Sequence, residues 1–244
     1  MIELPPLGDL VGSLWDALLD IAERMPDDWT LVGGQMVLLH AIEHGRTPPR
    51  ISQDLDLVVD ARVRPHAIPK MMEALSALGF EPAPISFDEI AHRFTRGEVA
   101  VDILAPEGTG PRTSLATIGR AETVPIKGGT YALNSSEPVE VTTARGRTGV
   151  VHRPDLAGAL LVKSRATRSD HRRGPERHLT DLAFLYSLVQ DPVAIGEQLG
   201  RAASYLARAN ELDAPDSEHW AILADDDVIA DAQAARNLIL AARG

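Results

Sequence analysis

The fold is decided by two nearby stretches of sequence, Gly33-Gly34 and Arg50-Ile51-Ser52-Gln53-Asp54-Leu55-Asp56. The second stretch leads into an apolar run typical of a strand, and strand side chains two residues apart point to the same face. Asp54 and Asp56 are therefore expected side by side. Neighbouring carboxylates repel each other unless a positive charge lies between them, and Mg²⁺ prefers oxygen ligands together with substrate phosphates. Because glycines at a helix start let backbone N–H groups approach a phosphate, the two stretches predict a site for a metal ion and a phosphate.

The elements expected around these stretches are strands and helices in the first part of the chain and helices alone in the second. Apolar runs predict strands at 29–32, 55–59 and 99–104, and a hairpin of 123–126 and 130–133 around Lys127-Gly128-Gly129. Helical periodicity predicts helices at 7–25, 35–44 and 65–78, and then at 155–168, 176–189, 193–209 and 226–242. The sequence therefore predicts an α+β fold, with a mixed-sheet core domain at 1–150 and a helical C-terminal domain at 151–244.

Asp102 interrupts an otherwise apolar strand that runs from Val99 to Leu104. A strand without alternating polar positions is typical of a sheet interior, where a carboxylate needs a partner or a metal ion. We expect Asp102 to be the third carboxylate of the site. The alternative is a residue at the strand end that caps a nearby backbone amide.

Basic side chains gather in the C-terminal half, although the whole chain carries a net charge of −11. Residues 163–177 contain six basic side chains and two acidic ones. Lys163 and Arg168 are the candidates for phosphate binding, because an ammonium group is a compact charge and a guanidinium can hold two phosphate oxygens at once. The alternative is an ordinary ion-paired surface helix. One basic segment on an acidic protein favours a localised polyanion, such as a triphosphate or one end of an RNA, over broad contact with nucleic acid.

The order of these residues resembles the pattern of the AbiEii/AbiGii-type nucleotidyltransferases, whose toxin members include the mycobacterial MenT proteins. The residues that carry the resemblance are Gly33-Gly34, Arg50-x-Ser52-x-Asp54-Leu55-Asp56, Asp102, Lys163, Arg168 and Asp181-Leu182. The resemblance spans about residues 30–185 and implies a polymerase-β-like nucleotidyltransferase core with a helical C-terminal domain. By position, it makes Asp54 and Asp56 the metal-binding pair, Lys163 the lysine that binds nucleotide phosphates, and Asp181 the late aspartate of the pattern. The chain departs from the family at Arg177-His178, where members often carry Lys-Asp.

The resemblance and the residues together predict an enzyme that transfers a nucleoside monophosphate from an NTP to an acceptor and releases pyrophosphate. Its cofactor would be Mg²⁺, with Mn²⁺ as a substitute. Asp54, Asp56 and Asp102 would hold the metal ions, with Asp102 acting as a ligand or as the base for the acceptor hydroxyl. The residues expected to bind the nucleotide are Gly33, Gly34, Ser52, Lys163 and Arg168, and those expected to act in catalysis are Asp54, Asp56, Asp102, Lys163 and Asp181. Because these residues come from both parts of the chain, we expect the active site in a cleft between two domains.

The resemblance implies an RNA acceptor, in particular a tRNA 3′ end. It also implies a toxin of a toxin–antitoxin or phage-defence system, opposed by a separately encoded antitoxin. Three alternatives stay open: a small-molecule acceptor, as in antibiotic-modifying members of the superfamily, a protein acceptor, and a catalytically silent nucleotide-binding protein. No feature of the sequence indicates which NTP base is used.

The composition limits the chemistry and the location of the protein. The 244 residues include no Cys, which excludes a disulfide, a thiolate nucleophile and a cysteine-ligated zinc ion. The N-terminus lacks the basic and apolar regions of a signal peptide, and no apolar run is long enough to span a membrane. We therefore expect a cytoplasmic protein without membrane contact.

Overall fold

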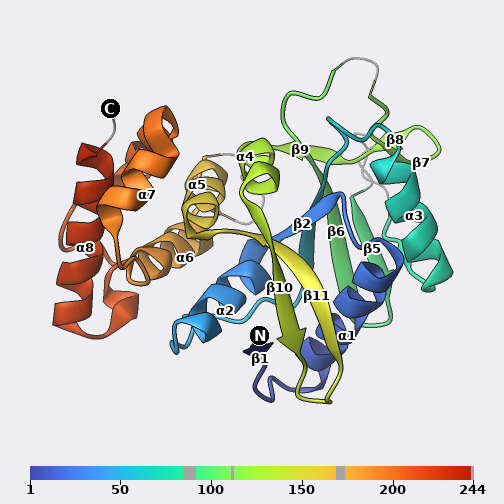
Figure 1. Ribbon diagram of the computed structural model, residues 1–244, viewed down its shortest axis with the longest axis horizontal. Coiled ribbons are helices and arrows are strands. Elements are labelled where there is room, and N and C mark those ends of the chain that lie inside the picture. The colour runs from blue at the N-terminus through green and yellow to red at the C-terminus, as the bar shows by residue number, and fades with distance from the viewer. Residues whose placement is uncertain (85–91, 111–112, 169–173, 243–244) are drawn as a thin grey trace. The chain divides into compact units, whose positions relative to one another are not determined.

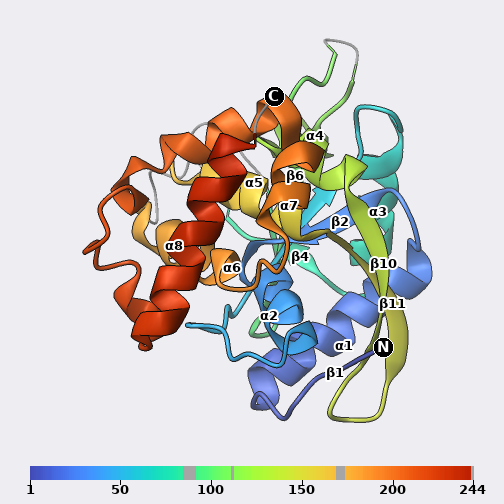
Figure 2. The same ribbon diagram turned by 60° about the vertical axis from the view of Figure 1, so that its left-hand side comes forward.

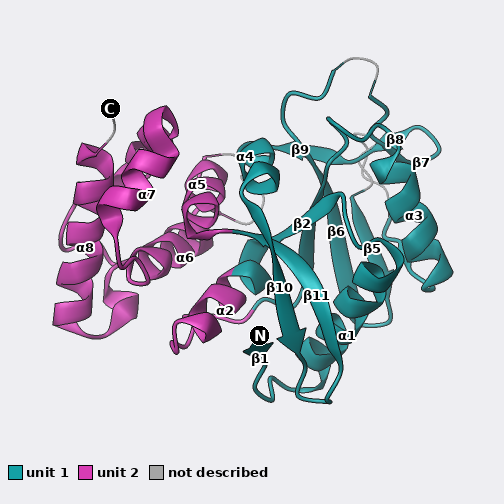
Figure 3. Cartoon of the chain, in the orientation of Figure 1, with its two compact units in different colours: residues 1–36, 52–154 teal, residues 37–51, 155–244 magenta. Residues whose placement is uncertain are grey.

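The computed structural model describes residues 1–84, 92–110, 113–168 and 174–242. The chain forms two compact units, one made of residues 1–36 and 52–154 and the other of residues 37–51 and 155–244 (Figure 3). The second unit thus includes the segment 37–51, which the sequence analysis placed in the first domain. Within the described ranges, no helix has both the length and the apolar character that crossing a membrane requires.

The first unit is built on a six-stranded mixed sheet (Figure 1). Its strands follow the order β2 (Trp29–Val32), β3 (Leu55–Val59), β6 (Val99–Pro106), β5 (Arg93–Arg96) and β4 (Glu81–Pro82), and β9 (Val124–Ile126) pairs with β6 beyond the end of β5. β3 and β6 are parallel and central, whereas β2 runs antiparallel to β3 and β5 antiparallel to β6. Apolar side chains of β3 and β6 are buried on both faces, as in Leu57, Val58 and Ile103. This explains why these strands read as nearly continuous apolar runs.

The remaining elements of the first unit cover and extend this sheet. β1 (Ile2–Glu3), β10 (Ser136–Thr142) and β11 (Thr148–Pro154) form a second sheet, and β7 (Ala116–Ile118) pairs with β8 (Ala121–Glu122). α1 (Asp9–Arg24) contacts both β6 and β11 through an apolar stripe that includes Leu14, Leu18 and Ile21, while α3 (Ala67–Ala77) contacts β3. The β10–β11 hairpin was not anticipated from the sequence, whereas the strands at 29–32 and 55–59 are confirmed.

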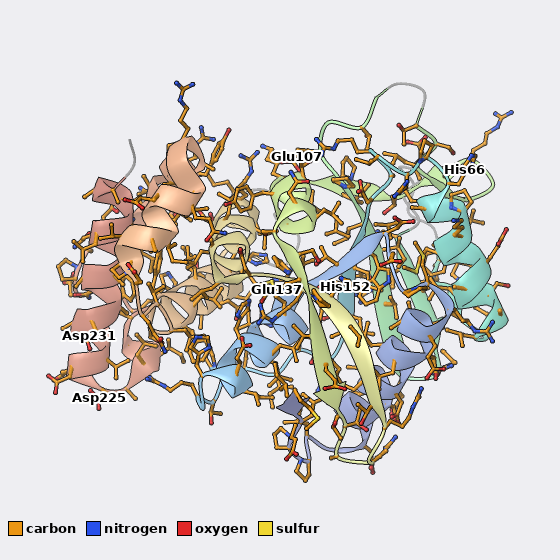
Figure 4. The ribbon with its side chains drawn as sticks, in the orientation of Figure 1. His66, Glu107, Glu137, His152, Asp225 and Asp231 are labelled. Carbon is orange, nitrogen blue, oxygen red and sulfur yellow. The ribbon has the colours of Figure 1, made fainter. Side chains whose placement is uncertain are left out.

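The predicted hairpin around Lys127-Gly128-Gly129 is wrong. Residues Val124–Ile126 form β9, which is parallel to β6, and residues Gly129–Asn134 form the helix α4. Gly128 precedes this helix with φ 88°, and the Glu107 carboxylate accepts hydrogen bonds from the backbone N–H groups of Gly128 and Thr130, at 2.9 and 3.1 Å. Figure 4 labels Glu107 at the beginning of α4. A distant carboxylate thus satisfies the first N–H groups of the helix, so the glycines begin a helix instead of closing a hairpin.

The second unit is helical, and this confirms the predicted α+β class with helices at the C-terminal side. It contains α5 (Leu156–Ala166), α6 (Glu176–Tyr186), α7 (Pro192–Leu199) and α8 (Asp226–Ala241), with 3₁₀ segments η1 (Gly200–Arg208), η2 (Asn210–Leu212) and η3 (Ala221–Leu223). The predicted single helix at 193–209 is wrong, because α7 ends at Leu199 and the next residue, Gly200, has a φ of 50° that breaks the α-helix. α5 packs on α6 and α7 packs on α8 (Figure 2). Gly196 allows the second contact, because a Cβ there would lie 2.7 Å from the Ala242 Cβ.

Candidate functional site

The three predicted aspartates belong to the first unit, and two of them share one row across its sheet. In the strand register, Asp56 of β3 lies beside Asp102 of β6, and Asp102 lies beside Arg93 of β5. Side chains at paired positions of neighbouring strands project from the same face. Asp54 lies one residue before β3 and two residues before Asp56. The sheet therefore places three carboxylates and one guanidinium on the same face.

Arg93 binds two of the three carboxylates. Its Nε donates to Asp102 Oδ1 at 2.7 Å, and its Nη2 donates both to Asp102 Oδ2 at 2.7 Å and to Asp54 Oδ2 at 2.8 Å. The side chains of Asp102, Asp54 and Arg93 are 6%, 13% and 31% exposed. The hydrogen bonds with Asp102 raise the pKa of Arg93 above its usual range against the opposing effect of burial, and the charge of Asp54 adds to the rise. The guanidinium is therefore a permanent positive charge between these carboxylates.

A chain of three hydrogen bonds, the two beyond the Ser52 hydroxyl buried, holds Asp54 from its other side. Ser52 Oγ donates to Asp54 Oδ1 at 2.6 Å, and the Ser52 carbonyl accepts from Gln35 Nε2 at 2.6 Å. Gln35 Oε1 in turn accepts from Trp15 Nε1 at 3.0 Å. Ser52 was predicted to bind the nucleotide, and the structure shows that its hydroxyl orients Asp54. Side chains that fix a carboxylate in this way set the geometry of whatever the carboxylate binds.

Gly33 lies against Asp56. α2 (Gly33–Glu43) begins directly after β2, two residues earlier than predicted, and Gly34 is buried in its first turn. Gly33 has φ 72°, and a Cβ there would lie 1.9 Å from Asp56 Oδ2. No residue other than glycine fits that space without moving the carboxylate. The first turn of α2, whose N–H groups have no carbonyl partner within the helix and which carries the positive end of the helix dipole, thus begins next to Asp56.

The aspartates of the first unit fit a hard divalent cation such as Mg²⁺. The donor set consists of carboxylate oxygens, which Mg²⁺ prefers, and the Gly33 backbone leaves room beside Asp56 that a side chain would fill. The three aspartates do not all bring an oxygen within 4.8 Å of one another. Within the described part of the chain, that criterion is met by Glu176, Glu218 and His219 of the second unit, of which both glutamates are exposed.

A second charged cluster lies in the second unit, around Asp181 of α6. Arg50 binds both oxygens of Asp181, with Nε at 3.0 Å from Oδ1 and Nη2 at 2.5 Å from Oδ2, and Lys163 Nζ of α5 lies 2.7 Å from Oδ2. Burial of Asp181 would raise its pKa, but the charges of Lys163 and Arg50 outweigh that effect and hold the pKa below its ordinary value. Lys163 and Asp181 are therefore a buried ion pair, and Arg50 was missed as a member of the cluster.

Arg168 lies in the second unit, and its side chain is bound within that unit. It donates to the carbonyl of Arg208 and to Asn210 Oδ1, both at 3.0 Å. Its neighbour Arg165 stacks on the ring of Tyr205, 4.0 Å from the ring centre. Residues 169–173 of the predicted basic segment lie outside the described residues. A nucleotide-binding role of Arg168 stays a prediction.

Sequence reasoning missed Arg93 and Gln35. The register of Arg93 could have been read from Gly97-Glu98, because a two-residue turn there pairs Arg96 with Val99 and so Arg93 with Asp102. Gln35 gave no such signal, because its partners are 20 and 17 residues away in the sequence.

Comparisons with known proteins show a distant likeness of fold. No protein-family model matches the sequence, and no curated protein is significantly similar to it. A solution structure of the antibiotic-resistance factor ANT(2″)-Ia aligns with 83% of this chain and 95% of its own, at 15% identity and a TM-score of 0.47. A crystal structure of ANT(2″)-Ia in complex with adenylyl-2″-tobramycin aligns with 84% of this chain and 100% of its own, at 12% identity and a TM-score of 0.43. Because the identities and TM-scores are this low, a function for this chain has to be argued from its own residues.

Proposed function

We propose that this protein is a Mg²⁺-dependent nucleotidyltransferase, which moves a nucleoside monophosphate from an NTP to an acceptor hydroxyl. The observation that supports this most directly is the approach of Gly33 to Asp56, which brings a helix start to a carboxylate on a row of acidic strand residues. A purely structural carboxylate does not need a neighbouring glycine with a positive φ. A helix start binds phosphate oxygens and a carboxylate binds a metal ion, so the two together fit a phosphate with its metal ion.

Each residue of the first unit has a separate task in this proposal. Asp54 and Asp56 bind the metal ion, which supplies charge stabilisation for the phosphate oxygens. Ser52 keeps Asp54 oriented through its hydroxyl. Gly33 and Gly34 let the first N–H groups of α2 reach the phosphates. Most of the rate acceleration would come from holding the reacting groups in place and stabilising charge.

The residues of the second unit are assigned to the triphosphate. Lys163 would stabilise the phosphates through its charge from its buried position beside Asp181, and Arg168 would add a second charge. Asp181 is buried and bound by Lys163 and Arg50, so it positions these cations and carries no proton in transfer at neutral pH. Replacement of Lys163 by Met should therefore weaken NTP binding, and unchanged binding would remove Lys163 from the proposal.

We propose the 3′ end of an RNA, such as tRNA, as the acceptor, with a toxin role that a separately encoded antitoxin would oppose. The support is the resemblance of the sequence pattern and the basic segment 163–177. A small hydroxyl compound of the antibiotic type is the second candidate. The net charge of −11 favours it, because an acidic surface repels the RNA backbone.

One assay separates these acceptors. The protein is incubated with each α-labelled NTP and Mg²⁺, together with total RNA, with tobramycin, or with protein extract, and the label is followed on gels and thin layers. Label on RNA supports the first acceptor, and label on tobramycin or protein redirects the assignment. Asp56→Asn should abolish every product.

The matched control is Asp60→Asn, which changes an aspartate directly after β3 whose carboxylate accepts a hydrogen bond from the Val63 N–H. This variant should retain the activity of the natural protein. If no acceptor is labelled and Asp56→Asn leaves Mn²⁺ and NTP binding unchanged, the proposed function is wrong.

A further inference from the structure

We propose that Arg93 takes the place of a second metal ion, so that the site binds one divalent cation, at Asp54 and Asp56, and uses Asp102 to hold Arg93. This inference rests on the proposed function and assigns Asp102 a positioning task in place of the metal-ligand role expected from the sequence. It also names Arg93 as a residue of the site, which the sequence analysis did not do.

One nitrogen atom of Arg93 occupies the space between two carboxylates. Arg93 Nη2 lies 2.8 Å from Asp54 Oδ2 and 2.7 Å from Asp102 Oδ2, so a single positive group bridges the two carboxylates. A metal ion shared by Asp54 and Asp102 would have to lie in the same space. The guanidinium and such an ion therefore exclude each other.

Asp102 is buried and hydrogen-bonded to Arg93 through both of its carboxylate oxygens. Both of its oxygens accept hydrogen bonds from Arg93, at 2.7 Å each, in the parallel fork that arginine forms with carboxylates. The side chain of Asp102 is only 6% exposed. Mg²⁺ usually keeps several of its water ligands, and a buried carboxylate bound on both oxygens leaves little room for them. Asp54 also accepts hydrogen bonds on both oxygens, from Ser52 Oγ and Arg93 Nη2, but Asp54 and Asp56 are more exposed than Asp102 and leave more room for a hydrated ion.

The sheet itself holds Arg93 in this place. Arg93 belongs to β5, which pairs with β6 through the two-residue turn Gly97-Glu98, and its register partner is Asp102. An arginine on a paired strand beside its partner is fixed by the backbone ladder. Arg93 is therefore a fixed member of the row that it forms with Asp56 and Asp102 across the sheet, and its charge is present before any ligand binds.

The test counts bound metal ions. Mn²⁺ serves as the probe, and its binding is measured by electron paramagnetic resonance in the presence of saturating non-hydrolysable analogues of ATP, GTP, CTP and UTP, each used separately. The natural protein should bind one Mn²⁺ per chain with the analogue that it accepts. Arg93→Gln should bind two, because the positive group that occupies the space between Asp54 and Asp102 is then removed.

Arg96→Gln is the matched control, because Arg96 lies on the same strand but pairs with Asp20 and with the Leu78 carbonyl. It should bind one Mn²⁺, as the natural protein does. Circular dichroism establishes that each variant is folded, and the count for the natural protein is informative even if a variant is not.

The possible counts have separate meanings. Two Mn²⁺ ions bound to the natural protein would overturn this inference, because the second ion would then have displaced the Arg93 guanidinium from the carboxylates. One Mn²⁺ ion bound to a folded Arg93→Gln variant would also overturn it, because the removal of Arg93 would then not have opened a second metal site. No Mn²⁺ bound with any analogue would instead overturn the proposed function on which the inference rests.

Discussion

Replacement of Gly33 by alanine tests the site at its tightest contact. The new Cβ would lie 1.9 Å from Asp56 Oδ2, whereas ordinary contact begins at 3.4 Å, so the carboxylate or the helix start must move by about 1.5 Å. In addition, alanine at a φ of 72° costs about 1–2 kcal/mol of stability, because its Cβ crowds the backbone in this region. The loss of stability and the displacement of Asp56 can be separated by the same substitution at a second glycine, one with a positive φ but no neighbouring side chain.

Gly146 is that second glycine, because it has φ 81° and nothing lies within 4 Å of a Cβ built there. Gly146→Ala should lower the free energy of unfolding by about 1–2 kcal/mol and leave Mn²⁺ binding unchanged. Gly33→Ala should cost at least as much stability and should also weaken Mn²⁺ binding and slow transfer about 100-fold or more, since a displacement of about 1 Å can have that effect. The assays are urea unfolding, Mn²⁺ titration and label transfer. If Gly33→Ala and Gly146→Ala transfer label at equal rates, Asp56 does not act where we place it.

Three further substitutions give distinct expected outcomes. Ser52→Ala removes the hydrogen bond to Asp54 Oδ1 and should weaken Mn²⁺ binding about tenfold with little loss of stability; an unchanged titration would contradict the orienting role. Gln35→Leu leaves the Trp15 indole N–H and the Ser52 carbonyl without their partner, and urea unfolding should show a loss of about 2–4 kcal/mol. Asp181→Asn leaves the cations around Asp181 without a countercharge and should cost about 3–5 kcal/mol at pH 7. Because the pKa of Asp181 is lowered below its ordinary value of 3.8 in the folded protein, its contribution is complete above that pH and is lost as the pH falls further. The difference between natural protein and Asp181→Asn, measured by unfolding between pH 7 and pH 3, should therefore shrink below pH 4, and a difference independent of pH would argue against the ion pair.

The sequence predicts the strand that carries Asp56 because local rules suffice there. Leu55–Val59 is apolar and bounded by polar residues, and the spacing of Asp54 and Asp56 places them on one face whatever the rest of the fold does. The hairpin at Lys127-Gly128-Gly129 failed for the opposite reason. The glycines fit a tight turn and a helix start equally well, and Glu107, from a distant part of the chain, decides between them.

The residues of the candidate site also differ in whether nearby sequence or distant parts of the chain determine their place. Ser52, Asp54 and Asp56 stand close together in the sequence, and their pattern after Gly33-Gly34 was sufficient to name them as candidates. Arg93 depends on strand register, and Arg50 meets its partner 131 residues away. Charge pattern alone does not tell a bridging arginine from a surface one, because both look the same in composition and differ only in what the fold brings beside them.

The division of the chain into two units has a consequence for how the protein is made. The second unit contains 37–51 and 155–244, so its first segment is synthesised long before the rest. Asp181 follows Arg50 by 131 residues, and at ribosomal rates that delay is about 7–26 s. Until residue 155 is translated, no other part of the second unit exists, and the site sequence from Arg50 to Asp56 spans the junction at residues 51–52. The charged cluster around Asp181 therefore forms only after α6 has been translated. A chain whose synthesis stops before α6 already contains Asp54, Asp56, Arg93 and Asp102, but its Arg50 still lacks the Asp181 carboxylate.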